Sequence, residues 1–218
     1  MNNQTILVAI VALLLGGIAG YAIGEGGKSE RQFGYRMEMN NDVPMGMHRM
    51  PDGTLMGNVV DDSGEMSHME HMMAMMVSSE RDFITGMIPH HQEAVDTAKE
   101  VIERGGTTPA IKELVENIVV AQEQEIAQMK QWHQDWYGEP YVESGEYMEM
   151  MRELEGLSGA EIDRRFLEDM IGHHMGAIMM AQSVQPHIEH TEIAELTQAI
   201  VLAQSAEIAQ MRQMLAEL

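Results

Sequence analysis

Two short stretches of the chain nearly repeat each other, and each contains two adjacent histidines. The first is MIPHHQEAV at residues 87–95 and the second is MIGHHMGAI at residues 170–178. The chain has 24 methionines, 10 histidines and no cysteine, so a soft metal ligand must be a thioether or an imidazole. We therefore predict metal ligands in both stretches, namely Met87, His90, His91, Met170, His173 and His174.

A second duplicated set of polar residues accompanies the histidines. Ile118, Gln122, Glu125 and Met129 follow one another at helical steps, on a stripe that would face a core. A buried Glu is costly unless a cation, an imidazolium or a metal compensates its charge. The predicted ligand set therefore also contains Glu125, Met129, Glu207 and Met211, with Gln122 and Gln204 as supporting residues beside the ligands.

Helix geometry separates the two histidines of each pair. Consecutive residues are rotated by about 100° around a helix axis, so both cannot readily chelate one ion. The apolar stripe places His91 and His174 in the core and turns His90 and His173 to the flank, toward a neighbouring helix. A metal ion would thus be shared between helices. In a purely structural alternative, the inward histidines only hydrogen-bond to the Glu of their own repeat.

Each histidine pair also follows a residue that helices disfavour. Pro89 precedes the first pair and Gly172 precedes the second. These residues indicate either a kink before the histidines or a packing constraint where two helices approach closely.

The elements that must position these residues are helices. Capping signals at Ser79–Asp82, Thr108–Pro109, Ser158–Glu161 and Thr191 predict four helix starts. A shorter helical connection is expected at 147–155. Three other histidines outside the repeat are expected at the surface or in loops, namely His133, His187 and His190.

The second pair of helices repeats the first. Phe83, Met87, His90, His91 and Ala94 recur with the same spacing as Phe166, Met170, His173, His174 and Ala177, and Gln122, Glu125 and Met129 recur as Gln204, Glu207 and Met211. Two helical hairpins, 79–137 and 158–218, would bury their apolar faces against each other. We expect an all-α four-helix bundle with pseudo-two-fold symmetry, and two chains could pair into a larger bundle.

The segment 25–78 predicts a flexible tether rich in Met and His. It is polar, lacks a sustained period, and has 12 methionines between Met37 and Met76. Flexible thioethers and imidazoles suit Cu(I) or Ag(I), whereas the alternative is a linker of biased composition. Auxiliary metal ligands are predicted at Met45, Met47, His48, His68, Met69, His71, Met72, Met73, Met75 and Met76.

The N-terminal segment 1–24 predicts a hydrophobic helix that is a signal peptide or a membrane anchor. The run from Ile6 to Ile23 carries no charge, and its length is at the lower limit for a membrane span. Basic residues follow the segment, which favours a cytoplasmic location by the positive-inside rule. The acidic bulk, with a net charge of −22, and the Met–His chemistry instead favour export. The same charge argues against nucleic-acid binding.

The two repeats resemble a bacterial family, the domain of unknown function 305. The signature Phe-x3-Met-Ile-x-His-His-x2-Ala and a later Gln-x2-Glu-Ile-x2-Met helix both occur twice in residues 80–215. The resemblance implies a ferritin-like four-helix bundle that is typically exported, and some members are similar to periplasmic copper-binding proteins. The second repeat departs from the pattern at Gly172, where Pro is usual, and at Gly176, which replaces the acidic residue Glu93.

These observations predict a periplasmic or cell-surface protein of copper homeostasis that sequesters or delivers Cu(I), Cu(II) or silver without turnover. Copper ranks ahead of iron, manganese and zinc. The first alternative is a ferritin-like di-iron or di-manganese oxidoreductase, but such sites use Glu-x-x-His motifs and neither repeat has one. The second alternative is a non-metal interaction module, which leaves the duplicated histidines unexplained.

Overall fold

The computed structural model describes residues 47–49, 55–57, 75–145 and 147–218. The N-terminal hydrophobic segment lies outside the described residues. So do six of the predicted tether ligands, namely Met45, His68, Met69, His71, Met72 and Met73. Within the described ranges, no helix is both long enough and apolar enough to span a membrane.

Part of the predicted tether forms a short β-hairpin. Strand β1 (Met47–Arg49) pairs antiparallel with β2 (Leu55–Gly57), with His48 opposite Met56. The sequence between the strands contains Pro, Asp and Gly, residue types that favour turns. This pairing was not predicted, because such short strands give no periodic pattern.

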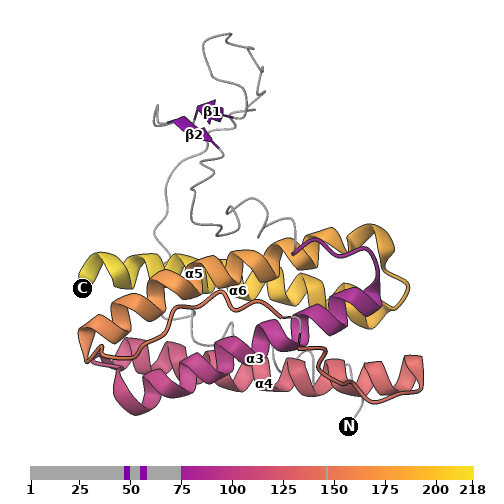
Figure 1. Ribbon diagram of the computed structural model, residues 1–218, viewed down its shortest axis with the longest axis horizontal. Helices are drawn as coiled ribbons and strands as arrows, with labels where there is room; N and C mark the ends of the chain where they lie inside the picture. The colour runs from indigo at the N-terminus through magenta and orange to yellow at the C-terminus, as the bar shows by residue number, and fades with distance from the viewer. Residues whose placement is uncertain (1–46, 50–54, 58–74, 146) are drawn as a thin grey trace, which may run out of the picture.

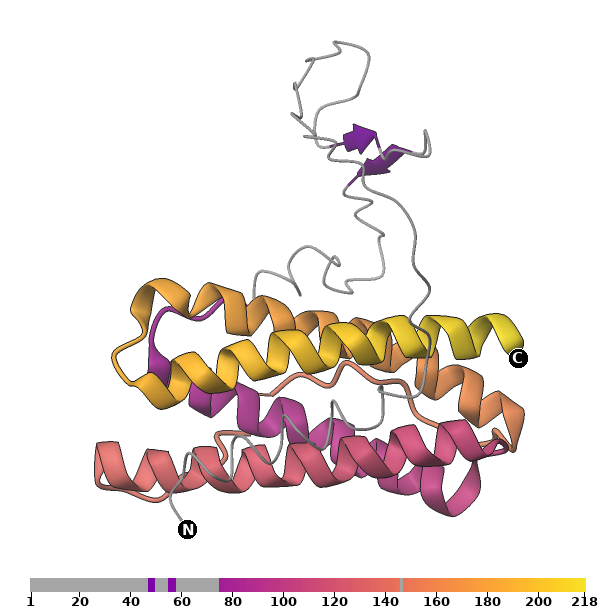
Figure 2. The same ribbon diagram turned by 180° about the vertical axis from the view of Figure 1, so that it is seen from behind.

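Four helices form the body of the molecule, as predicted. They are α3 (Glu80–Arg104), α4 (Pro109–Tyr137), α5 (Ala160–Ser183) and α6 (Thr191–Glu217), with a 3-10 turn η1 (Gln185–His187) before α6. Helix α3 packs along α4 and α5 packs along α6, and the two hairpins meet mainly through α3 and α5. Figures 1 and 2 show the four helices lying side by side along the long axis.

Local signals explain most of the helix ends. The Ser79 hydroxyl accepts a hydrogen bond from the Asp82 N–H, and Thr108 caps α4 through the Ile111 N–H. Gly138, in the left-handed conformation at φ 74°, ends α4. The predicted caps of the second hairpin were displaced to the adjacent position. Gly159 and His190 occupy the two cap positions, without a side-chain cap bond.

The two helices with histidine pairs are not disturbed in the same way. Helix α3 continues through Pro89 for its full length. Gly172 is exposed on α5, and a Cβ atom added there would meet nothing within 4 Å. Close approach of another helix therefore does not explain Gly172.

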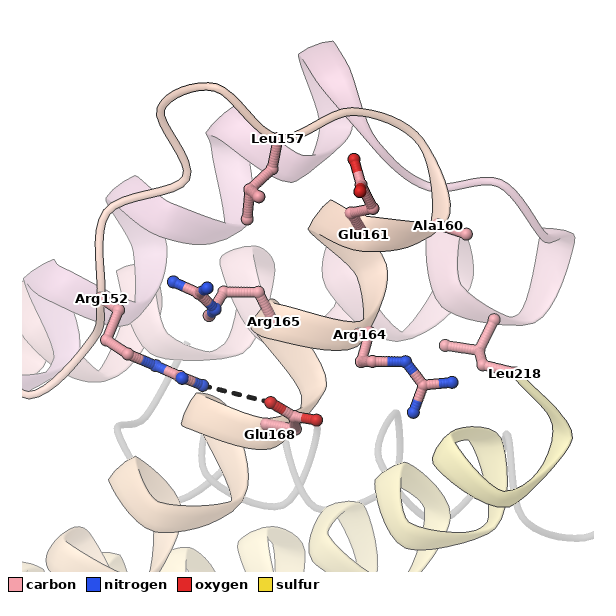
Figure 3. Close-up of a pocket in the computed structure, with 8 residues that line it drawn as sticks. All are labelled: Arg152, Leu157, Ala160, Glu161, Arg164, Arg165, Glu168 and Leu218. Atoms are coloured by element: carbon pink, nitrogen blue, oxygen red, sulfur yellow. Dashed lines mark hydrogen bonds and ion pairs between the residues drawn. The ribbon is translucent and has the colours of Figure 1, made fainter.

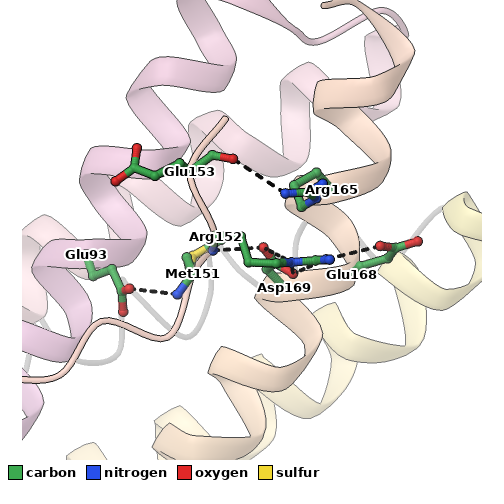
Figure 4. A network of polar contacts seen from close by, with 7 residues as sticks. All are labelled: Glu93, Met151, Arg152, Glu153, Arg165, Glu168 and Asp169. Carbon is green, nitrogen blue, oxygen red and sulfur yellow. Dashed lines mark hydrogen bonds and ion pairs between the residues drawn. The ribbon is translucent and has the colours of Figure 1, made fainter. Parts of the chain in front are cut away.

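The connection between α4 and α5 is not helical, so the prediction of a helix at 147–155 was wrong. Its backbone N–H groups donate to side chains of the bundle instead of to carbonyl groups of its own. Met150 and Met151 donate to Glu93 of α3, and Arg152 donates to Asp169 of α5. Figure 4 shows this part of the connection held between the two helices.

Two buried carboxylates at equivalent positions tie the hairpins to each other. Glu80, at the start of α3, accepts the N–H groups of Glu189 and His190 from the α5–α6 connection at 2.7 Å each. Asp163, at the start of α5, accepts the N–H groups of Gly106 at 2.6 Å and Thr107 at 2.8 Å from the α3–α4 connection. Each hairpin thus binds the connection of the other, and we call these contacts the crossed clamps.

The bundle core has two apolar clusters separated by polar residues. One cluster combines the start of α3 and the end of α5 with parts of α4 and α6, and the other combines the end of α3 and the start of α5. Along each helix, polar residues interrupt the apolar stripe between these clusters. We call this set the polar layer: His90, His91, Gln122, Glu125, His173, His174, Gln204 and Glu207.

Candidate functional site: a histidine layer in the bundle

The inward histidine of each repeat binds the glutamate of its own hairpin. His91 Nε2 lies 2.7 Å from Glu125 Oε2, and His174 Nε2 lies 2.7 Å from Glu207 Oε2. Both histidine side chains are fully buried. With the carboxylates ionised, Nε2–H donates and Nδ1 carries the lone pair. The predicted neighbours are therefore in place, and each ring keeps one nitrogen for another ligand.

The other two histidines meet each other across the two repeats. The ring centroids of His90 and His173 lie 3.7 Å apart, with the rings tilted by 35°. Both are buried, so they face the equivalent helix and not the solvent edge. Burial, together with the neighbouring His173, lowers the pKa of His90 well below its usual value. Burial likewise lowers the pKa of His173, and both rings are neutral at pH 7.

Glu93 joins this histidine pair to the α4–α5 connection. Its Oε2 lies 3.1 Å from His173 Nε2, close enough for an ion pair although not aligned as a hydrogen bond, and accepts from the Tyr147 hydroxyl at 2.5 Å. Its Oε1 accepts from the backbone of Met150 and Met151. Burial would raise the pKa of Glu93, but His173 and these donors outweigh it and lower the pKa. Figure 4 follows this network from Glu93 to Arg152 on the connection.

The four methionines predicted as ligands border the polar layer from both sides. Met87 and Met129 belong to one apolar cluster, Met170 and Met211 belong to the other, and all four are fully buried. Of the tether methionines, Met75 is buried whereas Met76 is 63% exposed. Met47 and His48 belong to strand β1 of the hairpin.

Several buried polar atoms in the layer lack a hydrogen-bond partner within the part of the chain that the structure describes. They are Nδ1 and Nε2 of His90, Nδ1 of His91, His173 and His174, and Oε1 of Gln122 and Gln204. Unpartnered buried polar atoms are rare in proteins and require an explanation, such as a bound water or ion. The described residues contain no group of three His, Asp or Glu side chains arranged around one metal position. A metal held here would therefore need the thioethers as well as the imidazoles.

The other three histidines lie away from this layer. His133 was expected at the surface but is buried, because its Nδ1 bonds to the Glu139 carbonyl oxygen at 2.9 Å. His187 is exposed in η1. His190 stacks on Trp136 at 3.8 Å and bonds to Glu80.

Two surface pockets differ in charge and in their relation to the layer. The larger, about 330 Å³, lies at the start of α5 and contains Arg152, Arg164 and Arg165 (Figure 3). It shares no lining residue with the polar layer. The smaller, about 210 Å³, lies between α3 and the α4–α5 connection and is lined by Glu93, Tyr147 and several other acidic residues. A cation near the surface would be attracted to this acidic pocket, which ends at the residue contacting His173.

Comparison with known proteins places this bundle in a family. The profile of the domain of unknown function DUF305 matches residues 31–133 and 80–215. A search of curated proteins found no match. Among solved structures, CopM in its Cu(II)-bound form is 34% identical with a TM-score of 0.60, covering 65% of this chain and 99% of that chain. CopM is also described in Cu(I)-bound and Ag-bound forms, each 35% identical with TM-scores of 0.59 and 0.58.

Two further structures carry the family name itself. A DUF305 fragment from Deinococcus radiodurans is 27% identical with a TM-score of 0.56, covering 66% of this chain and 99% of that chain. A DUF305 protein from Streptomyces coelicolor, described as secreted, is also 27% identical with a TM-score of 0.56, and the match covers 62% of this chain and 90% of that chain. The duplicated helices, the paired histidines and these matches agree, and the chain belongs to the DUF305 family.

Proposed function

We propose that this protein is an extracytoplasmic copper-binding protein that sequesters or delivers copper, and that also accepts silver. The observation that carries the proposal is the concentration of unpartnered imidazole nitrogens in the polar layer, five of the seven unpartnered atoms named there. Imidazole and thioether donors without thiolates suit copper in both oxidation states and silver. The CopM structures support the same cargo, since they show copper and silver in a relative of this fold.

The hydrogen bonds of the layer indicate how its residues would divide the work. Metal-binding histidines commonly donate their second ring nitrogen to a carboxylate, which fixes the orientation of the ring. Glu125 and Glu207 occupy that position, so we propose that they orient His91 and His174. The donors would be the four histidines together with the four methionines that border the layer.

The di-metal oxidoreductase has less support. Such sites need carboxylates shared between two metal ions. Here each of the carboxylates Glu93, Glu125 and Glu207 contacts one histidine, and no observation favours a bridging position. We propose export on the basis of the secreted Streptomyces relative and the hydrophobic segment 6–23, either as a signal peptide or as a membrane anchor.

A metal titration tests the proposed function. The full chain is titrated with Cu(I), Cu(II), Fe(II) and Zn(II), and then compared with His91→Ala/His174→Ala and with the exposed control His187→Ala. We expect the double variant to lose copper equivalents, while the control behaves as the parent chain. Circular dichroism checks that both variants keep their helices. Unchanged copper affinity and stoichiometry in the double variant would contradict a metal role for the layer.

The tether requires a separate test. Removal of residues 37–73 takes away ten of its methionines but leaves Met75 and Met76. We expect the shortened chain to lose weakly held Cu(I) and to keep the copper bound by the bundle. If no equivalents are lost, the tether is only a linker.

A further inference from the structure

The two repeats differ at one position beside the central histidine pair. Glu93 in the first repeat contacts His173, and Gly176 is its equivalent in the second repeat, since His90–Glu93 and His173–Gly176 have the same spacing. His90 therefore has no carboxylate in the place where His173 has one. Both ring nitrogens of His90 remain without a hydrogen-bond partner among the described residues, although the ring is fully buried.

Two thioether side chains fill the space that the missing side chain leaves. A Cβ atom added to Gly176 would lie 3.2 Å from His90 Nε2, 3.3 Å from Met75 Sδ and 3.4 Å from Met150 Cε. One imidazole nitrogen and two methionine side chains therefore converge on a single point. Gly172, one turn earlier on the same helix, has nothing within 4 Å of its added Cβ atom, so the convergence is specific to Gly176.

The chemistry of these donors differs from that of the other half. Around His173 the neighbours are a carboxylate and a phenol, which are hard oxygen groups. Around His90 the neighbours are neutral thioether side chains, whose sulfur atoms prefer soft monovalent ions such as Cu(I) and Ag(I). Small displacements of two flexible methionine side chains would bring both sulfur atoms to an ion held on Nε2.

We propose that His90 Nε2, Met75 and Met150 form the tightest site of this chain for a soft monovalent ion, Cu(I) or Ag(I). This inference rests on the proposed function and specifies one location and one oxidation state for it. The site is the tightest because its donors are already held close together in the folded chain, so less ordering entropy is lost on binding than in the tether. It also joins three parts of the chain: the end of the tether, helix α3 and the α4–α5 connection.

Paired leucine substitutions test the site with a close control. Met75→Leu/Met150→Leu removes both sulfur atoms at similar volume, which buried positions tolerate well. Met76→Leu/Met148→Leu changes the neighbouring exposed methionines, at 63% and 44% exposure. One equivalent of Cu(I) is added to the full chain in the presence of a chromogenic Cu(I) chelator. We expect the first variant to lose affinity by more than the roughly 10- to 100-fold that loss of an outer partner costs, and the control to match the parent.

A second readout does not depend on affinity. X-ray absorption of the chain with one equivalent of Cu(I) should show sulfur and nitrogen neighbours, and Met75→Leu/Met150→Leu should lose the sulfur signal. The pair Gly176→Ala and Gly172→Ala adds a steric test, because only the first places a methyl group against the three donors. We expect weakened Cu(I) binding in Gly176→Ala and unchanged binding in Gly172→Ala.

The outcomes separate this inference from the proposed function. If the parent chain binds Cu(I) tightly and both leucine variants match it, the inference is overturned and the proposed function stands. If the parent chain competes for neither Cu(I) nor Cu(II), both are overturned. Loss of the tightest equivalent in the first variant alone supports both.

Discussion

The ends and the middle of the two repeats follow different rules. At the ends, the crossed clamps are matched, because Glu80 and Asp163 hold equivalent connections through equivalent backbone N–H groups. In the middle, the equivalent positions carry Glu93 and Gly176, and their surroundings differ in charge and in donor type. The clamps are required by both halves for folding, whereas only one half needs a carboxylate beside its histidine. Duplication thus supplies a symmetric frame that encloses two unlike half-sites.

The largest effect should come from the frame. Glu80→Gln and Asp163→Asn each weaken a buried, charge-assisted set of hydrogen bonds, and we expect each to lower the free energy of unfolding by about 2–3 kcal/mol. Chemical denaturation measures both. The exposed control Asp96→Asn, which loses only a bond to Gln92, should change stability by less than about 0.5 kcal/mol. Strongly unequal losses in the two clamp variants would break the symmetry that we assign to the ends.

A smaller and more local effect is expected at the unmatched position. Glu93→Ala leaves the N–H groups of Met150 and Met151 and the Tyr147 hydroxyl without their acceptor, which should cost about 2 kcal/mol. Hydrogen exchange at the two methionine amides should become faster, while exchange within the helices changes little. Glu149→Gln, an exposed change in the same connection, serves as the control. Unaltered exchange at Met150 and Met151 would show that Glu93 does not hold the connection.

The smallest effect is a difference in pH dependence. Burial would raise the pKa of Glu80, but hydrogen bonds from His190 and Glu189 outweigh it, and the pKa lies below its ordinary value of 4.5. The stabilisation by this carboxylate is therefore complete above about pH 4.5 and is lost as the pH falls through the folded-state pKa. Glu80→Gln should show a weaker loss of stability than the parent chain between about pH 5 and pH 3. Equal acid sensitivity in both proteins would contradict the lowered pKa.

The sequence predicted the features that repeat at helical spacing. The four helices, two of the side-chain caps and the closeness of His91 to Glu125 follow from local signals and from the apolar stripe. Features that depend on contacts between distant segments were not predicted. The α4–α5 connection is not helical because its N–H groups reach Glu93 and Asp169, and neither contact leaves a pattern in the connection itself.

The convergence at Gly176 shows the same limit more sharply. The sequence marks Gly176 as a departure from the first repeat, but Met75 and Met150 lie in segments without periodicity. His133 was assigned to the surface because it lacks a repeat counterpart, whereas a single carbonyl contact and its position on α4 bury it. Pairing in space, not residue type, decided each of these cases.

The crossed clamps also have a consequence for synthesis of the chain. Glu80 leaves the ribosome early, but the N–H groups that it binds belong to residues 189 and 190, near the end of translation. The first hairpin likewise has its connection secured only after Asp163 has been made. The N-terminal hairpin must therefore wait for the second half before its own ends are fixed. A chain released before residue 190 would expose both apolar faces, so completion of synthesis and completion of folding are coupled in this protein.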